Sequence, residues 1–249
     1  RVWRIGVLHA GTPVTSAPMD EGFRSGLKAL GWVDGRNVLM ELRFAGGDVK
    51  RMDALMADLV AAKPDLIFAP TTSSAQAALR ATHDIPIVFA LPLDPVGSGL
   101  IASWARPGGN ATGATSMGID IAAKRLQLIK EVVPALSRLA VLEDPNANYN
   151  ASVLEVVKRA AKDLGVGVVV LNVSDQSEID AAFGRLARER LDGILVMDNP
   201  INYRYRQLIT ARAAAAGVPA IYPTGDYVDA GGFMSYGVSF VDQGRRAAS

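Results

Sequence analysis

The chain contains no cysteine and only two histidines, His9 and His83. Without cysteine there is no disulfide, no thiolate nucleophile and no cysteine-rich metal site. Two histidines that lie far apart in the sequence are a poor basis for a zinc site or a catalytic triad. We therefore expect no bound metal.

Long apolar runs and an excess of charge of one sign are also missing. No apolar run approaches the ~20 residues that a membrane span needs, and the formal net charge is +1 over 249 residues. A nearly neutral chain lacks the basic surface to which nucleic acids and other polyanions bind, so no nucleic-acid partner is expected. The length is sufficient for two modest domains or one large domain.

Strand and helix patterns alternate along the whole chain. Short apolar runs are separated by segments whose apolar residues recur at helical spacing. The predicted strands cover residues 4–10, 37–45, 66–69, 85–91, 138–143, 166–173, 193–197 and 219–222. In the second half, helices are expected near 148–164, 177–188 and 202–216. This alternation predicts parallel sheets with helices on both faces.

The two halves of the chain repeat one pattern. "KPDLIFAP", a helix and "IPIVFALP" in the first half are similar to "RLDGILVMDNP", a helix and "VPAIYPTG" in the second. The simplest interpretation is an α/β fold with two doubly wound parallel-sheet lobes. Ligands of such sheets bind beyond the carboxyl ends of the strands.

Six loops follow the predicted strands on that side. They are rich in Thr, Ser, Asn, Asp and Tyr, with few Lys or Arg, and cover residues 9–12, 70–74, 91–97, 143–150, 197–203 and 222–227. Hydrogen-bonding groups on a rigid scaffold suit a small polar solute. The alternative is that Asp, Asn and Pro simply make turns there.

The stretch "PTTSSAQAALRA", residues 70–81, places four hydroxyl side chains at the start of a helix. Ser73 and Gln76 fit the Ser-x-x-Gln capping box, which predicts Ser73 as the helix cap. Thr71 and Thr72 then remain beside unpaired backbone N–H groups and the positive end of the helix dipole. That arrangement is suited to a carboxylate.

The second half offers acids at matching places, Asp198 in "MDNP" and Asp226 in "TGDY". An acid together with a carboxylate-binding helix start indicates a ligand with both charges, such as an amino acid. Asp226 is about equally well explained as the N-cap of a helix that starts near Tyr227. Asp94 precedes a proline and can equally initiate a turn.

Two nucleotide motifs can be dismissed. Residues 97–102, "GSGLIA", match the dinucleotide pattern G-x-G-x-x-A, but Asp94-Pro95 precedes them where a strand should end and Pro107 cuts any following helix short. "PGGNATG" lacks the Gly-Lys-Ser/Thr of a phosphate loop. No cofactor is therefore expected.

His9 is predicted to be a neutral hydrogen-bonding residue at a strand end. The tyrosines near the loops either stack on a ligand ring or pack in the protein, and packing is the simpler role for each alone: Tyr149, Tyr203, Tyr222 and Tyr236.

Four segments resemble a known family: "GWVDGRNVLMELRFAGGD", "DPVGSGLIASWARPGGNATG", "AKRLQLIKEVVP" and "AIYPTGDYVDAGGFMSYG". They are similar to ABC-transporter substrate-binding proteins of the type I periplasmic-binding fold, in the subgroup with tryptophan- and phenylalanine-binding members. The resemblance implies two lobes that close on a solute and then dock on a membrane permease. It also implies that the chain returns to the first lobe near its end.

The resemblance also suggests roles for individual residues. Thr71, Thr72 and Ser73 fall where amino-acid-binding members hold the carboxylate, and Asp198-Asn199 matches a pair that contacts the polar end of the ligand. The chain differs from those members in "LPLDPVG", where smaller residues often precede the Asp-Pro, and in the bulky Tyr203 and Tyr205. The full set of candidate ligand-binding residues is Ala10, Gly11, Thr12, Thr71, Thr72, Ser73, Leu91, Asp94, Ser116, Met117, Asn146, Asn148, Tyr149, Asp198, Asn199, Tyr222 and Asp226.

The expected lobes are residues 1–115 with 238–249 and residues 116–237, with hinges near 115–118 and 235–239. The main hypothesis is a monomeric, non-catalytic solute-binding protein of an ABC importer, whose partners are the solute and the permease. The alternative is the ligand-sensing domain of a regulator or receptor with the same fold. An enzyme is disfavoured because no nucleophile–base pair is evident.

The ends of the sequence suggest an exported protein. The chain opens almost directly into a strand, without an initiating Met or a signal peptide, and stops within a predicted helix. We expect a periplasmic protein with its leader removed, either free or tethered by a lipid anchor, whose natural chain continues past Ser249.

Overall fold

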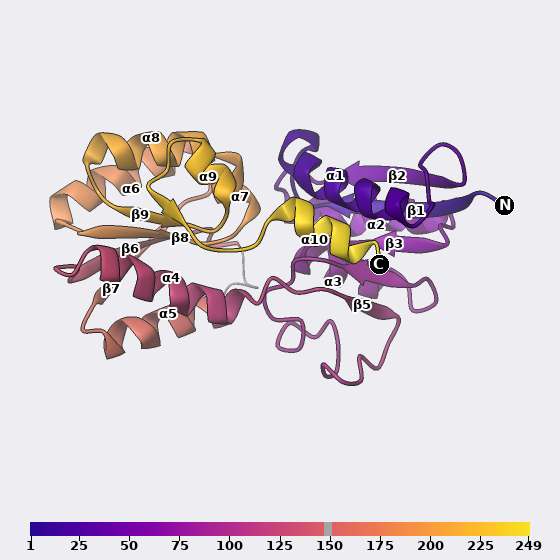
Figure 1. The fold of residues 1–249 in the computed structure, drawn as a ribbon, viewed down its shortest axis with the longest axis horizontal. Coiled ribbons are helices and arrows are strands. Elements are labelled where there is room, and N and C mark those ends of the chain that lie inside the picture. The colour runs from indigo at the N-terminus through magenta and orange to yellow at the C-terminus, as the bar shows by residue number, and fades with distance from the viewer. Residues whose placement is uncertain (147–150) are drawn as a thin grey trace. The chain divides into compact units, whose positions relative to one another are not determined.

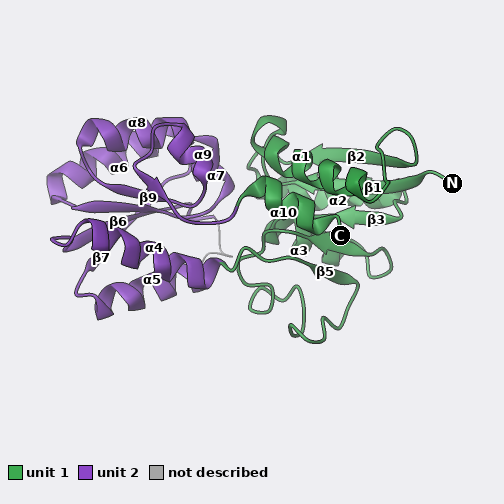
Figure 2. Ribbon diagram, in the orientation of Figure 1, with its two compact units in different colours: residues 1–117, 239–249 green, residues 118–238 purple. Residues whose placement is uncertain are grey.

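The computed structural model describes residues 1–146 and 151–249. The chain divides into two compact units (Figure 2): unit 1 is residues 1–117 with 239–249, and unit 2 is residues 118–238. The sequence-based boundaries were 115/116 and 237/238. Each unit contains one five-stranded sheet whose strand pairs are all parallel, which confirms the predicted α/β class.

Unit 1 alternates strands and helices and then receives the last helix of the chain (Figure 1). Its sheet has the order β2-β1-β3-β4-β5. Its elements are β1 Trp3–His9, α1 Pro13–Ala29, β2 Val38–Phe44, the 3-10 helix Val49–Arg51, α2 Met52–Ala61, β3 Leu66–Phe68, α3 Thr72–Ala81, β4 Ile87–Phe89, β5 Ala111–Gly113 and α10 Phe240–Ala247. The short β5 was not predicted.

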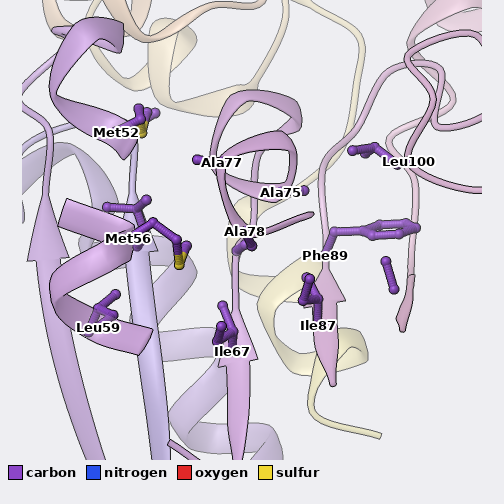
Figure 3. Close-up of a cluster of buried hydrophobic side chains, with 14 of the residues drawn as sticks. Met52, Met56, Leu59, Ile67, Ala75, Ala77, Ala78, Ile87, Phe89 and Leu100 are labelled. Carbon is purple, nitrogen blue, oxygen red and sulfur yellow. The ribbon is translucent and has the colours of Figure 1, made fainter. Parts of the chain in front are cut away.

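Two apolar clusters lie on opposite faces of the unit 1 sheet because successive strand residues point to opposite sides. Leu8 and Ile67 belong to the cluster under α2 and α3, whereas Val7 and Phe68 belong to the cluster under α1 and α10. Figure 3 shows side chains of α2 and α3 directed toward those of β3 and β4. The sheet is therefore covered on both faces, which explains why its central strands are almost wholly apolar.

Helix α10 packs closely on α1 because both helices have glycine at the contact. A Cβ added to Gly22 would lie 2.0 Å from the Val241 carbonyl oxygen, and one added to Gly26 would lie 2.6 Å from that of Arg245. On α10, a Cβ at Gly244 would lie 2.3 Å from the Met19 carbonyl oxygen. No larger side chain fits at these positions, so the glycines fix the return of the chain to unit 1.

Unit 2 repeats the same winding. Its elements are α4 Gly118–Val132, β6 Arg138–Glu143, α5 Ala151–Asp163, β7 Gly167–Asn172, α6 Gln176–Glu189, β8 Gly193–Val196, α7 Pro200–Arg204, α8 Arg206–Ala216, β9 Ala220–Tyr222, α9 Gly225–Asp229 and β10 Met234–Ser235. The order β7-β6-β8-β9-β10 corresponds to 2-1-3-4-5 by chain order within the unit, as in unit 1. Helices α4 and α5 cover one face of this sheet and α6 and α8 the other (Figure 1).

Most predicted elements are present, with local differences. The helix expected over 202–216 is two helices, α7 and α8, which meet at Tyr205. Strands β5 and β10 were missed because their residues, Ala-Thr-Gly and Met-Ser, do not form an apolar run. Among the described residues, no helix combines the length and apolarity that a membrane crossing requires.

Candidate functional site

The loops at the carboxyl ends of the unit 1 strands are joined by backbone hydrogen bonds. The Gly47 amide donates to the Ala10 carbonyl at 2.7 Å and the Gly46 amide to that of Gly11 at 2.9 Å. The Leu91 amide donates to the Pro70 carbonyl at 2.7 Å. The sequence-predicted residues Ala10, Gly11 and Leu91 therefore belong to a fixed edge of this sheet.

The cap of α3 is Thr71, so the predicted cap at Ser73 is wrong. Thr71 Oγ1 accepts from the Ser74 amide at 3.3 Å, and Ser74 Oγ accepts from the Thr71 amide at 3.0 Å. Gln76, the expected partner of Ser73, donates instead to the Ser98 carbonyl at 3.1 Å. Ser74 is a shorter partner than Gln76, and the box that it closes begins two residues earlier, at Thr71 instead of Ser73.

The cap at Thr71 determines which hydroxyl at the start of α3 is available. Thr71 and Ser74 are used by the cap, and Ser73 Oγ lies 3.2 Å from Thr71 Oγ1. The Thr72 hydroxyl makes no hydrogen bond within the described part of the chain, although Thr72 is only 4% exposed. Thr72 is therefore the side chain at this helix start that is best placed to take a new acceptor.

Helix α1 begins with the same device. Thr12 is its N-cap: Thr12 Oγ1 accepts from the Thr15 amide at 3.3 Å, and the Thr12 amide donates to Thr15 Oγ1 at 2.9 Å. A Cβ added to Gly11 would lie 2.3 Å from Thr15 Oγ1. The Thr12 hydroxyl, like that of Thr71, first serves helix formation.

Three further predicted residues lie near the exit from unit 1. Asp94 initiates a turn, since its carboxylate accepts from the Gly97 amide at 2.8 Å, so the simpler explanation for this residue is confirmed. Ser116 is buried and donates to the Leu91 carbonyl at 3.2 Å. Met117 is exposed and has φ of 51°, in the left-handed region that side chains rarely adopt.

In unit 2, Asp198 follows β8 and is half-buried beside a buried arginine that sequence reasoning missed. Arg125 of α4 is 5% exposed. Its Nε donates to the Tyr236 carbonyl at 2.6 Å and its Nη2 to that of Pro223 at 3.3 Å. The signal was a charged residue among the buried positions Ala122, Leu126 and Ile129 of one helix.

Burial acts on both charges. It raises the pKa of Asp198, and the positive charge of Arg125 opposes that rise. Burial likewise lowers the pKa of Arg125, which the negative charge of Asp198 partly offsets. Loss of solvent disfavours the ionised form of each group, so a positive charge brought close to Asp198 by a ligand would favour its carboxylate form.

Tyrosines connect Asp198 with Asp226. Burial raises the pKa of Tyr203 to about 12, and the nearby charges and a hydrogen bond of Asp226 contribute to the same rise. Tyr227 is fully buried, and its pKa is also raised by burial and by the charge of Asp198. Tyr222 stacks on Tyr227 with ring centroids 5.0 Å apart. The two predicted acids therefore belong to one cluster.

Packing is confirmed as a role for the buried Tyr203 and Tyr222, whereas Tyr236 is 43% exposed. The alternative of Asp226 as an N-cap is wrong, because α9 begins with Thr224 at that position. Asp226 lies in the first turn, where a negative charge favours the helix. It thus remains a candidate for binding.

Several buried polar atoms at this edge have no partner within the described part of the chain. They are Asn199 Nδ2, Thr224 Oγ1 and the Tyr227 hydroxyl. Asn199 uses only its oxygen, which caps α7 by accepting from the Asn202 amide at 2.8 Å. Buried groups of this kind usually have a partner, so they point to a ligand or water at this edge.

The loop after β6 is described only in part. Asn146 donates from its backbone and side-chain amides to Asp144 Oδ1, at 2.9 and 3.1 Å, and so forms a turn. The predicted residues Asn148 and Tyr149 lie outside the described residues.

Other predictions concern residues away from the carboxyl edge of the unit 2 sheet. His9 ends β1, is buried and lies 2.7 Å through Nε2 from Asp20 Oδ1, which confirms a hydrogen-bonding role. Residues 97–102 form turns and bends rather than the start of a long helix, which agrees with the rejection of a dinucleotide motif. Within 1–146 and 151–249, no group of three acidic or histidine side chains could hold a metal.

This chain is similar to known proteins over most of its length. A tyrosine-binding protein from Clostridioides difficile is 28% identical over 228 residues, which are 91% of this chain and 65% of that protein. A conserved domain protein from Vibrio cholerae has a TM-score of 0.91 at 26% identity, over 100% of this chain and 83% of the other. An ABC domain from Streptococcus pneumonia in complex with L-Trp has a TM-score of 0.89 at 24% identity, with the same coverage.

The two solved structures share the fold of this chain throughout its length. The family model described as ABC transporter substrate binding protein matches residues 14–249. The chain therefore belongs to the ABC transporter substrate-binding protein family, whose members bind solutes and are not enzymes.

Proposed function

We propose that the chain is the solute-binding component of an ABC importer and that its solute is an amino acid, aromatic or branched, or a related carboxylate. The observation that carries this proposal is Asp198, a half-buried acid at the carboxyl end of β8 whose pKa burial raises. An ammonium group would pair with this carboxylate and recover part of the lost solvation.

The carboxylate of the solute is assigned to unit 1. Thr72 combines a hydroxyl without a partner in the described chain with a place in the first turn of a ten-residue helix. The positive end of the helix dipole and the amides of that turn favour an anion there. Neutral donors suit a transport protein because they hold the anion without the strong attraction of a lysine.

The side chain of the solute is assigned to the aromatic class first. The tyrosine-binding relative supports this choice, although this chain spans only 65% of that protein. The unpartnered hydroxyl of Tyr227 and amide of Asn199 also provide donors for a polar atom at the end of a solute. L-Tyrosine is therefore the first compound to test, followed by phenylalanine and leucine.

Transport requires a change of state that a permease can recognise. Substrate-binding proteins of ABC importers work in the periplasm or outside the cell. We assign the same role to this protein, as a monomer that closes its two units on the solute, with flexible links near 115–118 and 235–239. Closure would then present a new surface to the membrane permease.

Mass spectrometry of small molecules released from denatured protein would identify what the protein carries from its host. Titration calorimetry with L-tyrosine, L-phenylalanine and L-leucine would follow, with Thr72→Val as the test variant. Loss of a hydroxyl that donates to a charged group costs about 1.5–3 kcal/mol, or roughly ten- to a hundredfold in affinity. Thr112→Val, on the exposed part of β5, is the control and should leave affinity unchanged.

Small-angle scattering would test closure separately. The radius of gyration should fall when the amino acid that binds in calorimetry is present at saturation. An unchanged radius, with binding shown by calorimetry in the same buffer, would contradict closure while leaving amino-acid binding intact. Absence of binding by every amino acid tested, together with a released solute that has no amino group, would contradict the proposed solute class.

A further inference from the structure

The chain passes between its units twice, at 117/118 and at 238/239. These two points are called crossing 1 and crossing 2. A helix follows each crossing: α4 begins at Gly118, and α10 begins at Phe240. The residues that precede the crossings are extended or bent segments at the carboxyl edge of each sheet.

In unit 2, the helix that follows crossing 1 holds the segment that precedes crossing 2. Arg125 lies about two turns into α4, and its guanidinium donates to the carbonyls of Tyr236, at 2.6 Å, and Pro223, at 3.3 Å. Gly237 makes this approach possible, since a Cβ there would lie 1.9 Å from the Pro223 oxygen and 2.9 Å from Arg125 Nη2.

Unit 1 has the reciprocal arrangement. Gln243 of α10, the helix after crossing 2, donates through Nε2 to the carbonyl of Thr115 at 3.4 Å. Thr115 precedes crossing 1 by two residues, just as Tyr236 precedes crossing 2 by two residues. Gln243 and Arg125 are only 4% and 5% exposed. Each is therefore a long polar side chain that is buried and donates to a backbone carbonyl.

Burial of such side chains is costly unless their hydrogen bonds are made, and a guanidinium costs more than an amide. A lysine or leucine would have filled the same volume without a fixed direction. The planar guanidinium, in contrast, can hold two carbonyls in one geometry. Simple packing therefore does not account for Arg125, whereas positioning of the segment that precedes crossing 2 does.

We propose that Arg125 and Gln243 are reciprocal positioning residues. Arg125 fixes the segment before crossing 2 to α4, the helix that follows crossing 1. Gln243 fixes the segment before crossing 1 to α10, the helix that follows crossing 2. Flexibility is then confined to Met117–Gly118 and Gly237–Ser239. This role concerns how the proposed closure is guided, and its functional meaning rests on the proposed function. The contacts themselves can be tested in ligand-free protein.

Hydrogen–deuterium exchange at two amides reports on the two segments. The Tyr236 amide donates to the Tyr222 carbonyl at 3.1 Å and reports on crossing 2; the Ser116 amide donates to that of Pro92 at 3.3 Å and reports on crossing 1. Arg125→Met should raise exchange at Tyr236 roughly tenfold or more without changing Ser116.

Gln243→Met should have the converse effect, faster exchange at Ser116 with Tyr236 unchanged. The increase should be smaller than for Arg125→Met, because the contact is longer and neither partner is charged. Arg125→Lys keeps the charge but loses the planar guanidinium, so it should also raise exchange at Tyr236. This variant replaces Arg125→Met in the test if Arg125→Met does not fold.

Matched controls lie on the exposed face of α8. Arg212→Met breaks only a surface ion pair with Asp180, and Gln207→Met changes an exposed side chain. Neither should change exchange at Tyr236 or Ser116. The central amides of Ile67 and Ile194 report on global stability; each donates at 2.9 Å to the carbonyl of the residue that precedes a neighbouring strand, Pro86 or Pro219.

Two outcomes would overturn the proposal. One is wild-type exchange at Tyr236 in both Arg125 variants. The other is an increase of the same size at Ile67 and Ile194 as at Tyr236, which would mean that Arg125 only stabilises the fold. Because no solute is present, neither outcome depends on whether the protein binds an amino acid.

Discussion

Gly22→Ala tests the contact that returns the end of the chain to unit 1. The added Cβ would lie 2.0 Å from the Val241 carbonyl oxygen, well inside van der Waals contact. The obstacle is backbone, so no change of rotamer relieves it and α10 must move away from α1. Overpacking of this kind costs about 3 kcal/mol, and the better helix propensity of alanine returns about 1 kcal/mol.

The net loss is therefore about 2 kcal/mol, or a Tm lower by about 4–8 °C for a chain of this size in differential scanning calorimetry. Gly184→Ala is the matched control: it lies within α6, and the nearest atom to its Cβ is the mobile end of Arg188, at 3.5 Å. It should raise Tm by about 1–4 °C. If Gly22→Ala leaves Tm unchanged or raises it as Gly184→Ala does, close packing of α10 on α1 does not stabilise the protein.

Three further predictions concern the helix cap and the acids. Thr71→Ala should cost about 1 kcal/mol of stability in urea denaturation because it removes the cap, and Ser73→Ala should cost much less. The Ser137 hydroxyl and amide hold the pKa of Asp192 below its usual range. Its ionised form therefore stabilises the fold above the unfolded pKa, and this stability is lost as pH falls through the folded pKa. Asp192→Asn should lower Tm at pH 7 and reduce the further decrease in Tm as the pH is lowered in a calorimetric pH series. Burial raises the pKa of Asp198, so its carboxylate is protonated at a higher pH than that of an ordinary aspartate. When affinity for an amino acid is measured from pH 7 downward, it should therefore begin to fall at a correspondingly higher pH.

The repeated fold could be predicted from the sequence because its central strands are apolar on both faces and its helices show a clear period. The two edge strands β5 and β10 could not, since pairing with β4 and β9, rather than their own residues, defines them. The close approach of α10 to α1 has only the glycines as a signal. Gly22 and Gly26 have the right spacing, but nothing local indicates which helix they face.

The place of the candidate loops in the fold was predictable from the sequence, whereas the hydrogen bonds within them were not. Parallel strands bring their carboxyl ends to one edge, so the loops of Thr72 and Asp198 could be identified. Which hydroxyl caps α3 depends on competition between neighbouring residues, and Thr71 with Ser74 is preferred to Ser73 with Gln76. Arg125 was missed because its partners are carbonyls about a hundred residues away.

The central claim is that Asp198 recognises the amino group of the solute. Titration calorimetry of L-tyrosine and of 3-(4-hydroxyphenyl)propionate, which lacks the amino group, would be compared in wild-type protein and in Asp198→Asn. Asp229→Asn, at an exposed aspartate of α9, is the control. We expect Asp198→Asn to weaken L-tyrosine roughly ten- to a hundredfold while it leaves the deaminated compound within a few-fold of wild type. Equal affinity of wild type and Asp198→Asn for L-tyrosine, with binding shown in both, would contradict the account.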